Sequence, residues 1–478
     1  MNKVYLLGIG GSAMGALACA LSDAGYDVSG SDNGVYSPMK EFLEQKNIRY
    51  YNTYAAENLL GENPQVVVVG NAISRGNPEL ECALNNRFVI RSMPELLRDE
   101  FIARHTSVVI AGTHGKTTTS SLCAWVLHNG GVRTGFFIGA VTGNFGTGAS
   151  CVPVSSNADS SESFFVSEGD EYDSAYFDKR SKFLSYRPDI AVINNLEFDH
   201  ADIFKSLDDI IASFRLFARL VPMNGIIYAN GDDVNVYNAC KDTPAPIETF
   251  GFGTSNVWRA VDIDYSPDAT NFTVLKNGII IARFSLSILG EHNVRNALAV
   301  VAVALRAGLS PESIQQGFDS FVAPKRRLEE IASFAGNVVI DDFGHHPTAI
   351  RLTLGAARQK YPGRRIVACF EPRSNTTTRS VFQHELVAAF DEADEVVLGR
   401  LNRPERYAPE DRLDRETLAS ALRERGKSVF VVPQEGESAW GWYVHEHFVQ
   451  AQLHDAVILL LSNGDVGGLR GMLSSTSG

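Results

Sequence analysis

The sequence predicts an α/β protein built from three domains. Short runs of β-branched and aliphatic residues alternate with amphipathic stretches along the chain, which is the pattern of parallel sheets covered by helices. The chain has 478 residues, and at about 100–200 residues per domain this length favours roughly three domains over one. Glycine is frequent, with 41 residues, which fits many tight turns between short elements.

The first block of strands, residues 1–104, is expected to form a small doubly wound, Rossmann-like domain. A glycine-rich turn and a helix follow its first strand. Its strands are predicted at residues 3–7, 26–32 and 65–70.

The second block, residues 105–323, is expected to form a parallel sheet of the P-loop ATPase type with a small antiparallel appendage. Strand-like alternation over residues 257–289 around the turn Lys276-Asn277-Gly278 indicates a hairpin, and a helix follows at residues 293–307. The Ser- and Asn-rich stretch 155–163 indicates a surface loop. Parallel strands are predicted at residues 107–111, 164–168, 190–194 and 225–229.

The third block, residues 324–478, is expected to form a second Rossmann-like domain and to bind an amino acid or peptide. The last residues, 474–478, are expected to be disordered. Strands are predicted at residues 337–341, 365–370, 395–398, 428–432 and 456–461.

The composition excludes several classes of protein. The 43 Lys and Arg residues against 56 Asp and Glu give a net charge of −13, which repels nucleic acids and anionic membrane surfaces, so neither is expected as a partner. No stretch approaches the ~18 apolar residues that span a bilayer, and no signal peptide precedes the first strand. The six cysteines form no C-x-x-C pair, which indicates reduced thiols. We expect a cytoplasmic protein.

The most specific motif is a phosphate-binding loop between an apolar strand and a helix predicted at 120–127. The backbone N–H groups of such a loop bind phosphate, Lys116 supplies a positive charge, and the Thr117 hydroxyl can ligate Mg²⁺. A strict P-loop has glycine where this chain has Ile110, so the motif is a shortened variant; a chance match in a βα turn is the alternative. The candidate ATP-binding residues are Gly112, Thr113, His114, Gly115, Lys116, Thr117 and Thr118.

A second glycine-rich turn follows the first strand and is similar to the dinucleotide-binding fingerprint. Asp32 lies at the end of the next strand, where an acid that binds ribose is expected. The third glycine of the fingerprint is replaced by Ala13, and a purely structural turn explains the small residues equally. The candidate residues for a nucleotide diphosphate are Gly8, Gly10, Gly11, Met14 and Asp32.

Two acidic clusters follow strands of the middle block, at residues 168–171 and 195–200. Divalent cations take carboxylate and hydroxyl oxygens, and a neutral imidazole can complete a second site. Since both clusters belong to the same block as the phosphate loop, we expect them at the same sheet edge. Glu168 and His200 are therefore candidate metal ligands; solvated loops are the alternative.

Four further polar patches are candidates for ligand binding. Residues 291–297 open a helix whose amides can meet adenine, or they serve capping and packing. The basic residues 325–327 can reach a γ-phosphate, or they form a solvated linker. Residues 341–347 cluster acids and imidazoles after a strand, and residues 370–379 carry two guanidinium groups suited to carboxylates.

Taken in order, these motifs resemble the Mur ligase family, the ATP-dependent amide-forming enzymes of bacterial cell-wall synthesis. The resemblance extends over essentially the whole chain and rests on several motifs in sequence. They are the glycine-rich turn, Gly-Thr-His-Gly-Lys-Thr, Glu-Gly-Asp-Glu, Asn-Leu-Glu-Phe-Asp-His, His-Asn-Val-Arg-Asn-Ala, Arg-Arg-Leu-Glu and Asp-Asp-Phe-Gly-His-His-Pro.

The turn Gly8-Ile-Gly-Gly and the string His345-His-Pro-Thr are most similar to the branch that extends UDP-N-acetylmuramate. Residues 171–183, 199–204 and 373–376 are similar to members that attach L-alanyl-γ-D-glutamyl-meso-diaminopimelate in peptidoglycan recycling. Members that attach L-alanine are the alternative; they typically carry Ser at the place of Tyr172 and Phe-Gln-Pro-His at the place of residues 370–373.

The resemblance implies phosphoryl transfer from ATP to the lactyl carboxylate, followed by attack of an amine on the acyl phosphate. It gives catalytic roles to Lys116, His200, Arg327 and His345. Thr117, Glu168 and His200 would hold Mg²⁺, and Asn296, Arg327 and Asp342 would join the phosphate loop in binding ATP. The peptide would meet His345, Arg373 and Arg379, and the UDP-sugar would meet Gly8, Gly10, Gly11, Met14 and Asp32.

Three points stay open at the level of sequence. Some family members use a carbamoylated lysine after the Asp-His motif, and Lys205 lies too close to His200 to be its counterpart. An NAD-dependent oxidoreductase, suggested by the first glycine-rich turn and Asp32, and a non-catalytic ATP-binding switch are alternatives of other classes, but the former leaves Lys116 and Glu168 unexplained. The oligomeric state cannot be predicted.

Overall fold

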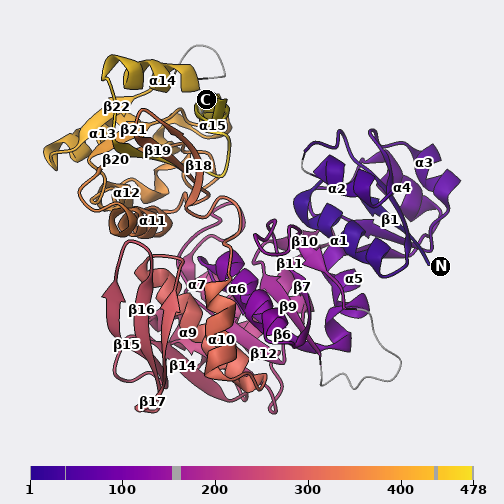
Figure 1. The fold of residues 1–478 in the computed structure, drawn as a ribbon. Coiled ribbons are helices and arrows are strands. Elements are labelled where there is room, and N and C mark those ends of the chain that lie inside the picture. Colours follow the sequence, from indigo (N-terminus) through magenta and orange to yellow (C-terminus); the bar gives the residue numbers. More distant parts are fainter. Residues whose placement is uncertain (1, 38, 153–162, 435–439, 476–478) are drawn as a thin grey trace.

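The computed structural model describes residues 2–37, 39–152, 163–434 and 440–475. Most strands belong to three sheets, which lie one after another along the chain (Figure 1). The predicted α/β class with parallel sheets is confirmed. Of the predicted loop at 155–163, only Ser163 is described, and it begins a strand; of the predicted disordered tail, Ser474 and Ser475 belong to the last helix, and 476–478 lie outside the described residues.

The N-terminal sheet has five parallel strands in the order β3-β2-β1-β4-β5. The order reverses between β1 and β4, and ligands of doubly wound sheets bind beside such a reversal. The strands are β1 (Lys3–Leu7), β2 (Asp27–Ser31), β3 (Arg49–Tyr51), β4 (Val66–Val69) and β5 (Ile90–Ser92). The helices are α1 (Ser12–Asp23), α2 (Met39–Gln45), α3 (Ala56–Glu62), α4 (Pro78–Asn85) and α5 (Met93–Glu100).

The central sheet has ten strands in the order β17-β16-β15-β14-β13-β12-β6-β9-β7-β8. The predicted hairpin is confirmed, and it continues the sheet because β15 pairs in parallel with β14 and in antiparallel with β16. A short antiparallel pair, β10 (Asp173–Ala175) and β11 (Asp178–Ser181), lies outside the sheet. The sheet strands are β6 (Thr106–Ala111), β7 (Arg133–Phe137), β8 (Ala149–Ser150), β9 (Ser163–Gly169), β12 (Ile190–Ile193), β13 (Ile226–Asn230), β14 (Ile247–Gly251), β15 (Trp258–Tyr265), β16 (Thr270–Lys276) and β17 (Ile279–Leu286).

Both faces of the central sheet are covered, which is why its strands are runs of apolar residues. Val108 and Ile110 of β6 face one apolar core with α6 (Lys116–Asn129), α9 (Glu291–Arg306) and α10 (Pro311–Asp319). The intervening Val109 and Ala111 face a second core with α7 (Leu207–Ala218) and α8 (Val234–Cys240). This second core continues without a break into the N-terminal unit.

The C-terminal sheet has the order β18-β19-β23-β20-β21-β22, with β18 antiparallel to β19. Its strands are β18 (Glu329–Phe334), β19 (Asn337–Asp342), β20 (Arg365–Phe370), β21 (Glu395–Leu398), β22 (Ser428–Val431) and β23 (Ala456–Leu461). Helices α11 (Pro347–Lys360), α12 (Glu385–Ala389) and α13 (Arg415–Glu424) cover one face, and α14 (Gly441–Gln450) and α15 (Leu469–Ser475) cover the other.

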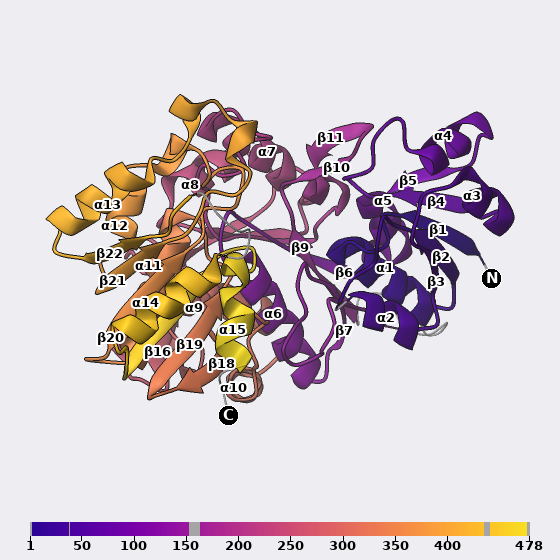
Figure 2. The ribbon, with the colours of Figure 1, turned by 90° about the horizontal axis from the view of Figure 1, so that it is seen from above.

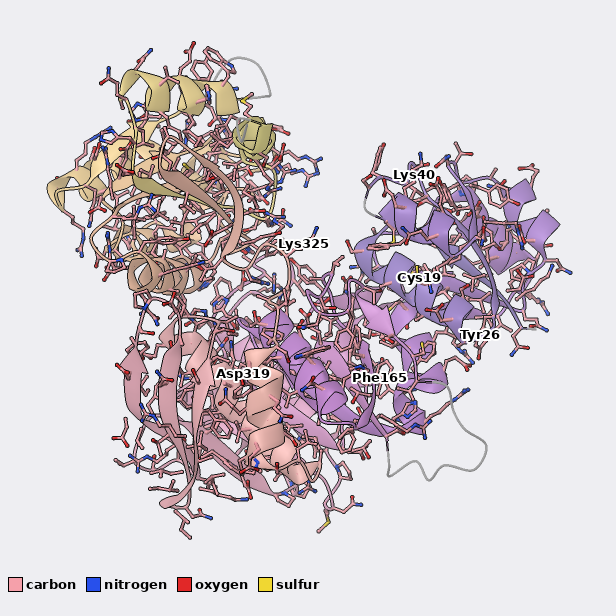
Figure 3. The ribbon with its side chains drawn as sticks, viewed as in Figure 1. Cys19, Tyr26, Lys40, Phe165, Asp319 and Lys325 are labelled. Atoms are coloured by element: carbon pink, nitrogen blue, oxygen red, sulfur yellow. The ribbon has the colours of Figure 1, made fainter. Side chains whose placement is uncertain are left out.

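The N-terminal and C-terminal units both lie against the central unit, and Figures 1 and 2 show them on different sides of it. Lys325 marks the connection between the central and C-terminal units (Figure 3). No helix among the described residues is long and apolar enough to cross a membrane.

Candidate active site

Three loops meet at the carboxyl edge of the central sheet, where β6, β9 and β12 end. β6 pairs with β9 on one side and with β12 on the other, so the loops after these strands are neighbours although His114 and Asn195 are 81 positions apart in sequence. The loop after β6 is the predicted phosphate loop, and the other two carry the acidic clusters. The two acidic clusters therefore lie beside the phosphate loop, as expected for one ligand-binding edge.

Two glycines and the side-chain amide of Asn195 fix the conformation of the phosphate loop. Gly112 and Gly115 have φ angles of 138° and 81°, conformations that L side chains rarely adopt. Asn195 accepts from the His114 N–H at 2.7 Å and donates to the His114 carbonyl at 3.0 Å. The helix α6 begins at Lys116, four residues before the predicted start, so its N-terminus faces the ligand edge and favours anions.

Lys116 lies in the centre of this edge and pairs with Glu171. Its Nζ donates to the Gly112 carbonyl at 2.7 Å and lies 2.9 and 2.8 Å from the two carboxylate oxygens of Glu171. Burial opposes the charge of both side chains, but their mutual attraction outweighs it, so the pKa of Lys116 is raised and that of Glu171 is lowered. Lys116 and Glu171 therefore form an ion pair, and the phosphates of ATP can compete with Glu171 for the lysine.

His200 approaches the same carboxylate from the β12 side. Its Nε2 lies 2.8 Å from Glu171 Oε1, and its ring packs on Tyr172 with a centroid separation of 4.3 Å. Burial alone would lower the pKa of His200, but Glu171 and Asp199 raise it overall. His200 also has a left-handed backbone, with φ of 54°, which is uncommon for a side chain of this size and typical of functional loops.

Thr117 and Glu168 form the second polar pair of the edge. The Thr117 hydroxyl donates to Glu168 Oε1 at 3.0 Å, and the Gly139 N–H donates to Oε2 at 2.9 Å. Burial raises the pKa of Glu168, and the positive charge of Lys116 only partly offsets this. A dication would relieve that cost of burying the carboxylate.

The C-terminal unit contributes a guanidinium group to this edge. Arg327 Nη2 lies 3.5 Å from Thr117 Oγ1, and its guanidinium stacks over Phe343. Asn296 lies on the other side of the loop: a Cβ added to Gly115 would come within 2.9 Å of its Oδ1. Thr118 is buried in α6. Asp342 is also buried, and its carboxylate accepts from the N–H groups of Leu328 and Gly344 at 2.9 and 2.7 Å, so it shapes the loop in this structure.

A second cluster joins the phosphate loop to the C-terminal unit. His114 Nε2 lies 3.0 Å from Glu197 Oε2, and His346 Nδ1 lies 3.5 Å from the same oxygen. The two imidazole rings are 4.4 Å apart. Burial lowers the pKa of His346 to about 3, and despite burial the neighbouring His114 lowers the pKa of Glu197 to about 2. At neutral pH the cluster is a carboxylate beside a neutral imidazole of His346.

The predicted peptide-binding residues are spread over the facing edge of the C-terminal sheet. His345 follows β19, its Nδ1 is 3.0 Å from the Phe343 carbonyl, and burial lowers its pKa. Arg373 follows β20 and lies 3.6 Å from Glu371. Arg379 stacks over Tyr407, and its Nε has no hydrogen-bond partner among the described residues. Of these three side chains, only Arg379 has a buried nitrogen without a hydrogen-bond partner among the described residues.

The predicted UDP-sugar residues divide into two groups. The backbone N–H of Gly10 donates to Asp32 Oδ2 at 2.9 Å, and Tyr54 donates to Asp32 Oδ1 at 3.2 Å. Asp32 borders a hollow of about 520 Å³, and Gly10 lines a cavity of about 190 Å³ between the N-terminal and central units. Met14 is instead buried in the core of the N-terminal unit. Gly8 and Gly11 close the turn, with the Gly11 N–H donating to the Gly8 carbonyl at 3.2 Å.

The structure brings together residues that the sequence did not single out. Glu171 links Lys116 to His200, and Asn195 clamps the phosphate loop. Both lie inside predicted acidic clusters, so their position after a strand was a usable signal. Glu197 and His346 meet only through the folding of two units, and no spacing in the sequence indicates that contact.

Three family models match successive segments of the chain. The Mur ligase family catalytic domain matches residues 3–105, the Mur ligase middle domain matches residues 110–304, and the Mur ligase glutamate ligase domain matches residues 326–461. The chain belongs to the Mur ligase family. It is therefore an ATP-dependent ligase that forms amide bonds, and the oxidoreductase and non-catalytic alternatives are set aside.

Two curated relatives of this Mur ligase carry the same name. UDP-N-acetylmuramate–L-alanyl-γ-D-glutamyl-meso-2,6-diaminoheptandioate ligase of Haemophilus influenzae is 38% identical over 83% of this chain and 85% of its own. Its namesake from Escherichia coli is 40% identical over 83% of this chain and 84% of its own. UDP-N-acetylmuramate–L-alanine ligase of Lactobacillus acidophilus is 36% identical over 79% and 80% of the two chains.

Solved structures support the same relationship. The murein peptide ligase of Psychrobacter arcticus 273-4 matches this Mur ligase with a TM-score of 0.73 and 32% identity, covering 100% of this chain and 99% of that chain. The UDP-N-acetylmuramate-alanine ligase of Thermotoga maritima gives a TM-score of 0.76 at 22% identity, covering 99% of both chains. At that identity the second match supports the three-unit fold and not a choice of substrate.

Proposed function

We propose that this Mur ligase joins the lactyl carboxylate of UDP-N-acetylmuramate to the amine of L-alanyl-γ-D-glutamyl-meso-diaminopimelate, in peptidoglycan recycling. The observation that carries the proposal is the meeting of Lys116, Thr117 and Arg327 at one sheet edge. Two cations and a helix N-terminus converge there from two units, which suits a triphosphate. The two relatives at 38% and 40% identity, both named for this tripeptide, support the choice of acceptor.

The reaction needs an acid to be activated before an amine attacks it. The lactyl carboxylate attacks the γ-phosphorus of ATP and ADP leaves, giving an acyl phosphate; the amine then attacks the acyl carbon and phosphate leaves. Lys116 would exchange its contact with Glu171 for the transferring phosphoryl group, while His200 keeps Glu171 paired. Arg327 would balance the charge of the γ-phosphate from the opposite side.

The pair Thr117–Glu168 fits a magnesium ion. Octahedral Mg²⁺ at about 2.1 Å from each ligand places neighbouring ligands about 3 Å apart, and the two oxygens are 3.0 Å apart in this structure. His200 would serve a second ion in place of its hydrogen bond to Glu171, and the charge of that ion would then compensate Glu171. When bound, Mg²⁺ neutralises phosphate charge and orients the γ-phosphoryl group.

Each unit is assigned one substrate in this proposal. Residues 1–104 would bind the UDP-sugar, residues 105–323 would bind ATP, and residues 324–478 would bind the peptide through His345, Arg373 and Arg379. The cavity lined by Gly10 and residues 138–141 supports a UDP-sugar between the first two units. The cytoplasm is the proposed location, consistent with the six free cysteines.

The acceptor assay tests this function. ADP release is measured with UDP-N-acetylmuramate and ATP in the presence of the tripeptide, of L-alanine, or of neither. We expect release that depends on the tripeptide and a product whose mass is the sum of both substrates less water. Exclusive use of L-alanine would favour the alternative supported by the relative at 36% identity, and release independent of any amine would contradict ligation.

A further inference from the structure

We propose that His114, Glu197 and His346 form a binding site for a divalent transition-metal ion of the Zn²⁺ class. The site is separate from the Thr117–Glu168 pair and has no part in the phosphoryl transfer described above. One ligand comes from the phosphate loop, one from the loop after β12 and one from the N-terminus of α11. A bound ion would therefore connect the central and C-terminal units.

The distances between the ligand atoms match a metal of this class. Bonds of about 2.0–2.2 Å in tetrahedral geometry place ligand atoms about 3.3–3.6 Å apart. Glu197 Oε2 lies 3.0 Å from His114 Nε2 and 3.5 Å from His346 Nδ1. One ligand atom from each of the three side chains lies within 4.8 Å of the others, so a small rotation brings them around one ion and leaves a fourth position for water.

The donor set selects against magnesium. Mg²⁺ prefers six oxygen ligands, whereas two imidazoles and one carboxylate suit Zn²⁺, Co²⁺ and Ni²⁺. The metal would take the place of the hydrogen bond between His114 Nε2 and Glu197 Oε2. It would also replace the hydrogen bond of 3.2 Å from the Thr348 N–H to His346 Nδ1.

His346 already has the tautomer of a ligand. Its Nε2 lies 3.2 Å from the Phe198 carbonyl, so a proton on Nε2 leaves Nδ1 unprotonated; in this structure Nδ1 accepts from the Thr348 N–H, and Glu197 Oε2 lies 3.5 Å away. Metal-binding histidines commonly donate their second nitrogen to a backbone carbonyl in this way, which fixes both the tautomer and the ring. Phe382 packs edge-on against the same ring at 4.5 Å and limits its rotation.

Cobalt binding tests the site directly. The full chain is freed of metal, placed in excess Mg²⁺ to saturate oxygen-rich sites, and titrated with Co²⁺ while visible ligand-field absorption is recorded. We expect one equivalent to bind with the spectrum of a four-coordinate nitrogen and oxygen site. Glu197→Ala and His346→Ala are each expected to raise the Kd for Co²⁺ beyond the about 10–100-fold that loss of a supporting residue costs.

Two matched variants serve as controls. His454→Ala removes an exposed imidazole whose Nδ1 lies 2.9 Å from the Gln452 carbonyl, and His200→Ala disturbs the proposed magnesium pocket; both are expected to keep the cobalt spectrum. Glu197 is about one-third exposed, with 36% of its side chain accessible, so Glu197→Ala decides the question where His346→Ala does not fold. An unchanged Kd in Glu197→Ala, or a spectrum lost in His200→Ala, would overturn the proposal.

Discussion

Glu171 is the residue on which the charges of the active site depend. Its buried carboxylate lies within 2.9 Å of Lys116 and 2.8 Å of His200, so an ammonium group and an imidazole share one carboxylate. An unpaired buried charge is costly. When Lys116 turns toward phosphates, His200 can stay hydrogen-bonded to Glu171. The buried carboxylate then keeps a partner, which lowers the free-energy cost of the movement.

Lys116→Ala tests the role of this lysine. We expect kcat to fall by on the order of 10³-fold, because the charge on the transferring phosphoryl group loses its partner. In the proposed function the UDP-sugar binds the N-terminal unit, so its Kd measured by calorimetry should stay within about threefold. Lys179→Ala, which removes an exposed ammonium, is the control. Turnover like that of the wild type in Lys116→Ala would remove the phosphate-loop assignment.

His292 makes the fold sensitive to acid. Burial lowers its pKa to about 4, whereas a histidine in the unfolded chain has a pKa near 6.5. Between these values the unfolded state binds more protons, so the free energy of unfolding falls as the pH falls, by up to about 2 kcal/mol from pH 7 to pH 5. Denaturation at both pH values should show a smaller loss in His292→Gln; equal losses in the two proteins would contradict this.

The element that organises the site is the loop between β6 and α6. Its two left-handed glycines allow the chain to turn from strand to helix within the residues 112–115. Gly115 has an additional constraint, since a Cβ would meet Asn296 Oδ1 at 2.9 Å. Gly131 at the other end of α6 has φ of 84° and open space around it.

A comparison of Gly115 with Gly131 separates the effect of backbone strain from the effect of steric crowding by a new Cβ. Gly131→Ala should cost only the left-handed strain of about 1–2 kcal/mol and leave ATP binding unchanged. Gly115→Ala should cost at least as much in stability and also raise the Kd for ATP at least tenfold, because Asn296 and the loop must move apart. Thermal unfolding and nucleotide titration measure both effects. Equal Kd values for the two variants would contradict the crowding argument.

Several strands that are unbroken runs of buried apolar residues could be predicted from the sequence, whereas β7, which is mostly buried but is not such a run, was not predicted. The apolar runs of β6, β12 and β23 predicted their strands, and the glycine-rich loops predicted the phosphate-binding edge. The sequence did not indicate β18, whose residues are half-exposed and include Glu329 and Glu330, or the two-residue strand β8. Neither strand has the continuous apolar pattern on which such predictions depend.

Contacts between units are the part of the site that local sequence patterns could not predict. Arg327 reaches Thr117 across 210 positions, and His346 reaches Glu197 across 149 positions. Such contacts follow from how the C-terminal sheet is placed on the central one. The family resemblance gave Arg327 a role without showing this geometry.

At the scale of the whole molecule, polar contacts hold the C-terminal unit to the central unit. The Thr376 hydroxyl donates to Asp199 Oδ1 at 3.1 Å and accepts from the Ala201 N–H at 3.3 Å. Asn375 donates to Asp202 at 2.9 Å. Thr376 and Asp199 are both buried, so this small contact excludes water.

Thr376→Val tests how firmly the two units are joined. The isosteric change leaves the Asp199 carboxylate short of one donor, at a cost of about 1–3 kcal/mol. Hydrogen exchange at Ala201 should therefore become roughly 5–150-fold faster. Thr377→Val, which loses hydrogen bonds only to Ser374 in its own loop, should leave that exchange rate unchanged; equal acceleration in both variants would contradict the assignment.

The N-terminal unit is attached in a different way. Its apolar core continues into the central unit, Phe101 stacks on Phe165 at 6.1 Å, and Cys151 donates to the Ala20 carbonyl at 3.3 Å. Apolar burial of this kind resists relative movement, whereas small polar interfaces permit it. We therefore expect the site to close by rotation of the C-terminal unit about the segment near Lys325. Binding of the acceptor would then immobilise this unit, and the entropic cost would weaken the affinity for the acceptor.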